Sequence, residues 1–247
     1  EALARSAIGE LLLVDFDDVC ITNSNRQLQA LQGNVGKPKA WILRDRLRLV
    51  NPQAKIEAKR EFYHAHKADD VIGGDVSVVV DCIDNLTAKA HLLSECRKRG
   101  IAFVSSMGAA GKLDPTRIRI SDLSETVVDP LAREMRKILR TKYAFPAEGP
   151  MGIAAVSSDE RRAWPKELTY DHGEGFTCVC PKGDELVSDV RANNHSCDEK
   201  TLIDGTAVFV TGAFGLACAA HVVNTLTAEL RDAAPKARAK QGTVRDD

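Results

Sequence analysis

The chain has 247 residues, of which 44% are hydrophobic and 28% charged, so it can bury a complete core as one large domain or two small ones. Its net charge of −1 excludes a nucleic-acid binder that relies on overall positive charge, and any such contact must use a local basic patch. The seven cysteines are odd in number and scattered, which excludes a densely cross-linked secreted domain. With no signal-peptide pattern in view, we expect a reducing, cytoplasmic location.

The first elements read as helix, strand and helix. Residues 1–9 resemble the second half of a helix with Gly9 as its C-terminal cap. The apolar run over residues 11–14 ends in an acid and is typical of a buried parallel strand. After a polar loop at 24–36, Pro38 opens an amphipathic helix from Lys39 to Val50.

The same alternation continues to residue 142. We expect strands over 55–62, 76–81, 101–105 and 117–120, a helix over 86–99 capped by Gly100, and a basic helix over 129–142. Strands that alternate with helices of about a dozen residues pair in parallel. The sequence therefore predicts an α/β fold with a Rossmann-like, doubly wound and mostly parallel sheet.

The last third of the sequence is less regular. Residues 146–204 are rich in Gly, Pro and charge, with residues 176–180 as their one expected strand. The apolar stretch over 206–223 contains two threonines and His221, which favours a buried core or interface helix over a membrane helix. We expect the main α/β domain to cover residues 1–145, its C-terminal part to cover 146–230, and a disordered tail to cover 231–247.

Polar side chains follow two of the predicted strands. Asp15 closes the first strand, where a carboxylate commonly accepts hydrogen bonds from a ribose, and Asp84 follows the strand over 76–81, where a carboxylate can hold magnesium against phosphates. Between them, Asn23, Arg26 and Lys39 offer the amide and positive charge that phosphoryl or adenylyl transfer needs. Taken singly, each is more often a helix cap, a turn residue or a surface residue. The prediction of a nucleotide site therefore depends on the order in which these residues occur together.

The order of the motifs resembles the nucleotide site of the superfamily of ubiquitin-activating enzymes and of molybdopterin and thiamine adenylyltransferases. The motifs are DFDDV, TNSNRQ, VGKPK and VVVDCIDN. The resemblance implies that the chain binds ATP and Mg²⁺, with the ribose on the first aspartate, the phosphates on the Asn, Arg and Lys, and magnesium on Asp84. It assigns nucleotide binding to Asp15, Asp17, Asn23, Arg26, Lys39, Asp84 and Asn85. It implies catalytic roles for Arg26, Lys39 and Asp84.

Residues 105–140 narrow the resemblance to the tRNA threonylcarbamoyladenosine dehydratases. A Gly-rich turn and a DPT triplet precede a basic helix, and residues 152–160 and 205–215 are also similar to that family, which usually has Asn where this chain has Gly111. The resemblance implies ATP-dependent cyclisation of threonylcarbamoyladenosine in tRNA through an acyl-adenylate. For tRNA binding it favours Arg133, Arg136, Lys137 and Arg140; the alternative for such a helix is an ordinary solvated face.

Members of the superfamily open with a strand and a glycine-rich phosphate loop of the pattern GxGGVGS. The sequence contains no such pattern, so we expect that strand and loop to be missing from it, and truncation and real loss both stay open. Real loss would favour a non-catalytic scaffold.

A second alternative is an adenylyltransferase for a ubiquitin-like or sulfur carrier protein. Such enzymes commonly hold zinc with two CxxC pairs, whereas the close pair here is Cys178 and Cys180 in CxC spacing. A metal or redox cluster with Cys197, His172 or His195 is less favoured than ordinary thiols. We expect a homodimer formed through the apolar helix, with a sulfur-transfer or redox partner left open.

Overall fold

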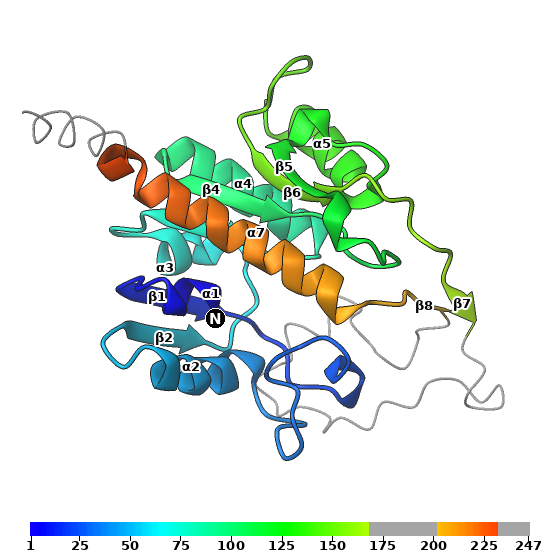
Figure 1. Cartoon of the computed structure of the whole chain (residues 1–247). Coiled ribbons are helices and arrows are strands. Elements are labelled where there is room, and N and C mark those ends of the chain that lie inside the picture. The colour runs from blue at the N-terminus through cyan, green and yellow to red at the C-terminus, as the bar shows by residue number, and fades with distance from the viewer. Residues whose placement is uncertain (168–201, 232–247) are drawn as a thin grey trace, which may run out of the picture.

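The computed structural model describes residues 1–167 and 202–231 (Figure 1). Its larger sheet has the strand order β3-β4-β6-β5, in which β3, β4 and β6 run parallel and β5 is antiparallel. A second parallel sheet consists of β1 and β2, and a short antiparallel pair of β7 and β8. The strands are β1 (Glu10–Val14), β2 (Lys55–Lys59), β3 (Val78–Asp81), β4 (Ala102–Ser106), β5 (Ile118–Asp122), β6 (Ala154–Ser158), β7 (Lys166–Glu167) and β8 (Leu202–Ile203).

Helices cover both faces of the larger sheet. On one face, α4 (Leu86–Arg99) and α5 (Pro130–Lys142) enclose a core around Leu93, Met135 and Ala155. On the other, α7 (Val208–Leu226) crosses the strands, as Figure 1 shows in orange. The smaller sheet packs against α1 (Ala2–Arg5) and α2 (Lys39–Val50), and α3 (Ala68–Ile72) contacts α4. The short 3-10 helices are η1 (Ile21–Asn23), η2 (Ala65–Lys67), η3 (Pro115–Arg117) and η4 (Leu123–Glu125).

Most predicted elements are confirmed. The helices over 39–50 and 86–99 have the predicted bounds, and Gly100 ends the second with a left-handed φ of 66°. The predicted cap at Gly9 was wrong, because the first helix already ends at Arg5 and Ser6 is its cap. The prediction that 146–204 held a single strand at 176–180 was also wrong, because β6 lies at 154–158. Its small residues give a weak strand pattern, and residues 176–180 lie outside the described part.

The carboxylate of Asp122 fixes the turn that leads into β6. It accepts hydrogen bonds from the backbone amides of Met151, Gly152 and Ile153, at 2.7 to 3.1 Å, and from Ser124. Burial pushes its pKa upward, but these hydrogen bonds outweigh burial and hold the pKa at about 2. This ionised carboxylate therefore connects the end of β5 to the start of β6.

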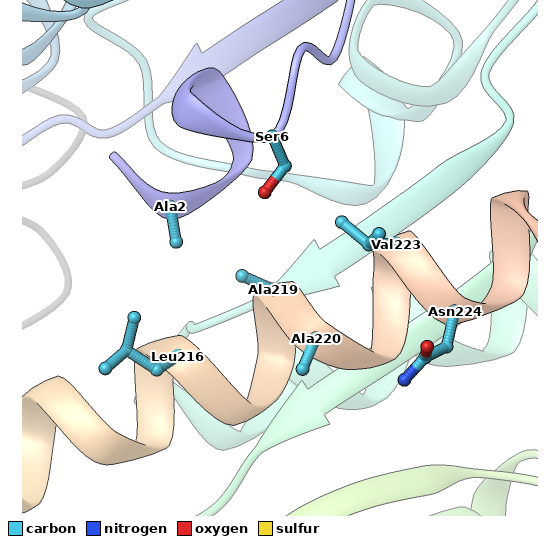
Figure 2. Close-up of a pocket in the computed structure, with 7 residues that line it drawn as sticks. All are labelled: Ala2, Ser6, Leu216, Ala219, Ala220, Val223 and Asn224. Carbon is cyan, nitrogen blue, oxygen red and sulfur yellow. The ribbon is translucent and has the colours of Figure 1, made fainter.

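One face of α7 remains exposed. Val210, Phe214, Cys218 and Val222 pack on the sheet, whereas Leu216 is 62% exposed. A hollow of about 330 Å³ separates α7 from α1; Figure 2 shows Ala2 and Ser6 on one side and Leu216, Ala219, Ala220, Val223 and Asn224 on the other. None of these residues belongs to the predicted nucleotide site. By length and composition, α7 is also long and apolar enough to cross a membrane, and only one of its faces packs on the sheet.

Candidate functional site

The carboxyl end of β1 meets the start of α2. The Asp15 carboxylate accepts a hydrogen bond from the Asp17 amide at 2.9 Å. The Lys39 ammonium lies 2.6 Å from the Asp17 carboxylate, and the Lys39 amide donates to the Asp17 carbonyl. Lys39 is the first residue of α2 and is 9% exposed. The structure thus brings three residues of the DFDDV and VGKPK motifs together at a helix N-terminus, where anions are favoured.

Asp84 lies close enough to this group to influence it electrostatically. Burial is the main cause that raises the pKa of Asp15, and the negative charge of Asp84 adds to it while Lys39 opposes it. The Asp84 side chain is exposed on the loop after β3. The neighbouring Asn85 caps α4 by accepting the Ala88 amide at 3.0 Å. Asp84 therefore presents an exposed carboxylate whose charge reaches Asp15, whereas the Asn85 side chain holds the helix start.

The TNSNRQ loop is ordered by its own side chains. Asn23 is buried and its amide oxygen accepts the Cys20 amide at 3.1 Å. The Arg26 guanidinium donates to the Thr22 carbonyl and to the Asn25 side chain. Asn25 in turn donates to the Thr206 carbonyl at 2.9 Å, which connects the loop to the segment that leads into α7. These contacts shape the loop; a nucleotide role for Asn23 and Arg26 stays a prediction.

Arg60 is a residue of this site that sequence reasoning missed. The pairing of Val14 with Lys59 places Arg60 beside Asp15, at the ends of β1 and β2. Its guanidinium lies 2.8 Å from the Asp18 carboxylate, so it anchors the last acid of DFDDV. An arginine directly after a predicted parallel strand, next to a strand that ends in three acids, was an available signal.

A buried ion pair supports the loop that carries Asp84. Lys89 and Asp81 have fully buried side chains 2.8 Å apart. Lys89 also donates to the carbonyls of Ile83 and Ser106, at 3.0 and 2.8 Å, and Asp81 accepts from the Ser105 hydroxyl at 2.6 Å. Sequence reasoning missed Lys89, although it shares a helix face with Leu86 and Leu93 by its three- and four-residue spacing. The pair joins the ends of β3 and β4 beneath the site.

The Gly-rich turn connects the sheet to the basic helix. The Asp129 carboxylate caps α5 through the Ala132 amide and accepts the Gly108 amide at 2.9 Å. The buried Lys112 ammonium donates to the Ser158 carbonyl and lies 3.5 Å from the Asp129 carboxylate. The N-terminus of α5 is therefore fixed against this turn.

The four basic residues predicted to bind tRNA differ in their surroundings. Arg136 donates to the carbonyls of Leu123 and Thr126 and to the Thr126 hydroxyl. Arg140 donates to the Pro146 carbonyl at 3.1 Å. Arg133 and Lys137 are exposed on the helix surface. The exposed pair is the part of the predicted tRNA surface most open to an RNA backbone.

Within residues 1–167 and 202–231, no three His, Cys, Asp or Glu side chains gather as they would around a metal ion. Of the cysteines there, Cys82, Cys96 and Cys218 are free thiols. The cysteines and histidines considered for a metal or redox cluster, Cys178, Cys180, Cys197, His172 and His195, lie outside the described residues.

The chain is similar to known proteins over most of its length. The chain is 33% identical over 237 residues to the tRNA threonylcarbamoyladenosine dehydratase of Escherichia coli, covering 93% of this chain and 81% of that protein. The crystal structure of the E. coli enzyme in complex with ATP superposes with a TM-score of 0.74 at 30% identity, over 98% of this chain and 82% of that one. The molybdopterin-synthase adenylyltransferase of Salmonella typhimurium is 32% identical over 112 residues, 45% of this chain and 44% of that protein. The ThiF family model matches residues 1–243, and the chain belongs to the ThiF family.

Proposed function

We propose that this chain is an ATP-dependent tRNA threonylcarbamoyladenosine dehydratase, which cyclises threonylcarbamoyladenosine in tRNA. The observation that carries the proposal is the gathering of Asp15, Asp17, Lys39 and Asp84 at the carboxyl ends of β1 and β3, where open α/β sheets bind nucleotides. The match to relatives of that name, over 93% of this chain and 81% of the Escherichia coli protein, supports the same function.

The reaction converts a poor electrophile into a good one. An oxygen of the threonine carboxylate attacks the α-phosphorus of ATP, and pyrophosphate leaves. An atom of the neighbouring ureido group then attacks the activated acyl carbon, AMP leaves with the former carboxylate oxygen, and the ureido group loses a proton. The net change is loss of water from the nucleoside. Because nucleophile and electrophile belong to one molecule, holding the substrate in place makes ring closure effectively unimolecular.

The residues of the site fit the charge changes of the first step. Lys39 lies at a helix N-terminus and would neutralise charge on the polyphosphate. We propose Arg26, whose guanidinium donates to the Thr22 carbonyl, as a second cation for the phosphates. Asp15 would accept hydrogen bonds from the ribose. The ion pair with Asp17 holds the Lys39 ammonium near the end of β1, so its position does not depend on the nucleotide.

Mg²⁺ fits the oxygen donors at this site. Asp84 offers an exposed carboxylate whose charge reaches Asp15, and magnesium in nucleotide sites is usually held by one or two carboxylates together with substrate phosphates. When bound, the ion would neutralise charge on the phosphates. Asp84 is the residue that we propose as its ligand.

The test uses tRNA that carries threonylcarbamoyladenosine. With ATP and magnesium, the protein should convert threonylcarbamoyladenosine to a nucleoside lighter by one water, as measured by mass spectrometry of the digested tRNA. One AMP and one pyrophosphate should be released into solution per tRNA, as measured before digestion. An Asp84→Asn variant, which keeps the side-chain shape and removes the charge, serves as the matched control. Release of pyrophosphate only upon addition of a ubiquitin-like carrier protein would instead establish the adenylyltransferase alternative.

The proposed assembly rests on the exposed face of α7. Val208, Phe209 and Leu216 are each more than half exposed on that helix, and we propose that a second copy covers them in a cytoplasmic homodimer. Light scattering at micromolar concentration should give twice the monomer mass. A monomer would remove this part of the proposal and leave the catalytic part standing.

A further inference from the structure

Trp164 is a large aromatic side chain held at the protein surface. It is 84% exposed, the highest value of any aromatic residue in the described part of the chain. The guanidinium of the adjacent Arg162 lies 5.8 Å from the centre of its ring. A single exposed apolar residue is ordinary, so its meaning depends on what fixes it and on what lies next to it.

Backbone hydrogen bonds fix the segment that carries this tryptophan. The Ala163 amide donates to the Gly111 carbonyl and the Gly111 amide donates to the Gly205 carbonyl, each at 2.7 Å. Gly111 has a φ of 71°, and a Cβ at that position would lie 2.9 Å from the Ala163 carbonyl oxygen. The positive φ and the close approach of the Ala163 backbone both favour glycine at this position. Trp164 is the next residue after Ala163, so these hydrogen bonds lie directly before it in the chain.

The segment lies between the nucleotide loop and the basic helix. Asp204, one residue before Gly205, has its carboxylate 3.6 Å from the Arg162 guanidinium. The carbonyl of Thr206, one residue after Gly205, accepts a hydrogen bond from the side-chain amide of Asn25 in the TNSNRQ motif. On the other side of the turn, the Lys112 ammonium lies 3.5 Å from Asp129, the cap of α5. The segment that carries Trp164 is therefore connected through residues 204–206 to the TNSNRQ loop and through Gly111 to the turn before α5.

An exposed indole with arginine beside it matches the way proteins hold single-stranded RNA. Unpaired bases stack on aromatic rings and on guanidinium planes, and the neighbouring phosphates pair with arginine. Arg161 adds a second exposed cation next to Arg162. We infer that Trp164 and Arg162 form a stacking platform for an unpaired base of the tRNA loop next to the modified nucleoside. The inference rests on the proposed function for the identity of the RNA.

Fluorescence provides the first test. The chain has two tryptophans, so a Trp41→Phe background leaves Trp164 as the single indole. An RNA hairpin with an unpaired loop should quench its emission, whereas an RNA duplex of equal length should not. Equal quenching by both RNAs, or none by the hairpin, would overturn the stacking platform.

Binding to the same hairpin provides the second test. Trp164→Ala should weaken binding by about tenfold or more, Trp164→Phe should recover most of the loss, and affinity for ATP should stay unchanged. The slope of binding against salt should also stay unchanged, because stacking releases no counterions. A Trp164→Ala variant with wild-type RNA affinity would refute the inference even if the protein cyclises tRNA normally. Quenching by the hairpin without any cyclic product would support the platform and refute the proposed reaction.

Discussion

The buried pair of Lys89 and Asp81 gives the most direct test of the structure. Substituting Lys89 by Met keeps much of the side-chain length and removes the charge, which leaves the Asp81 carboxylate without its cation and the carbonyls of Ile83 and Ser106 without their donor. Removal of one partner of a buried pair costs about 3 to 5 kcal/mol. In a domain of this size that corresponds to a fall in Tm of roughly 10 °C.

The measurement is urea denaturation of wild type, Lys89→Met, Asp81→Asn and the double variant. Both single variants should lose stability, and the double variant should lose less than their sum by about 2 kcal/mol or more, because it leaves no uncompensated charge. Lys98→Met is the matched control on the same helix. Its side chain is 65% exposed and pairs with Glu95, so its loss should stay below about 1 kcal/mol. Equal losses for Lys89→Met and Lys98→Met would refute the buried pair.

The remaining predictions concern the site and its surroundings. Asp84→Asn should lower the rate of tRNA cyclisation about a hundredfold at saturating ATP, which corresponds to roughly 2.7 kcal/mol of lost transition-state stabilisation. The Tm of the free protein should stay nearly unchanged, because the Asp84 side chain is exposed. A wild-type rate would exclude Asp84 as a magnesium ligand. Replacing Arg133 and Lys137 together by Ala should weaken tRNA binding and reduce the salt slope by about two, since each phosphate contact releases about one counterion, and an unchanged slope would place the RNA elsewhere. The pKa of Asp122 is depressed to about 2, so its contribution to the free energy of unfolding is present above the unfolded-state pKa near 4 and is lost as pH falls toward 2. In acid titrations monitored by circular dichroism, wild type should lose on the order of 1 to 2 kcal/mol of stability between these pH values. Asp122→Asn should not show this loss.

The sequence by itself determined the alternation of strands and helices and the nucleotide motifs. The helix over 39–50 follows from its apolar period and Pro38, and the helix over 86–99 from Asn85 at one end and Gly100 at the other. These signals are local, because caps and apolar periods act within a few residues. The motif order was readable for the same reason, since Asp15 directly follows the first strand and Asp84 lies three residues after the end of β3.

Only the tertiary structure decided which side chains form contacts that stabilise the fold and which stay exposed. Arg133 and Arg136 look alike in the sequence, but Arg136 donates to carbonyls of the preceding segment while Arg133 is exposed. Strand β6 formed from small residues because β4 and β5 lie on either side to pair with it. Trp164 acquired a fixed position only through Gly111 and Gly205, which are distant in the chain. In each case the deciding contact joins segments far apart in sequence, and local pattern contains no record of such contacts.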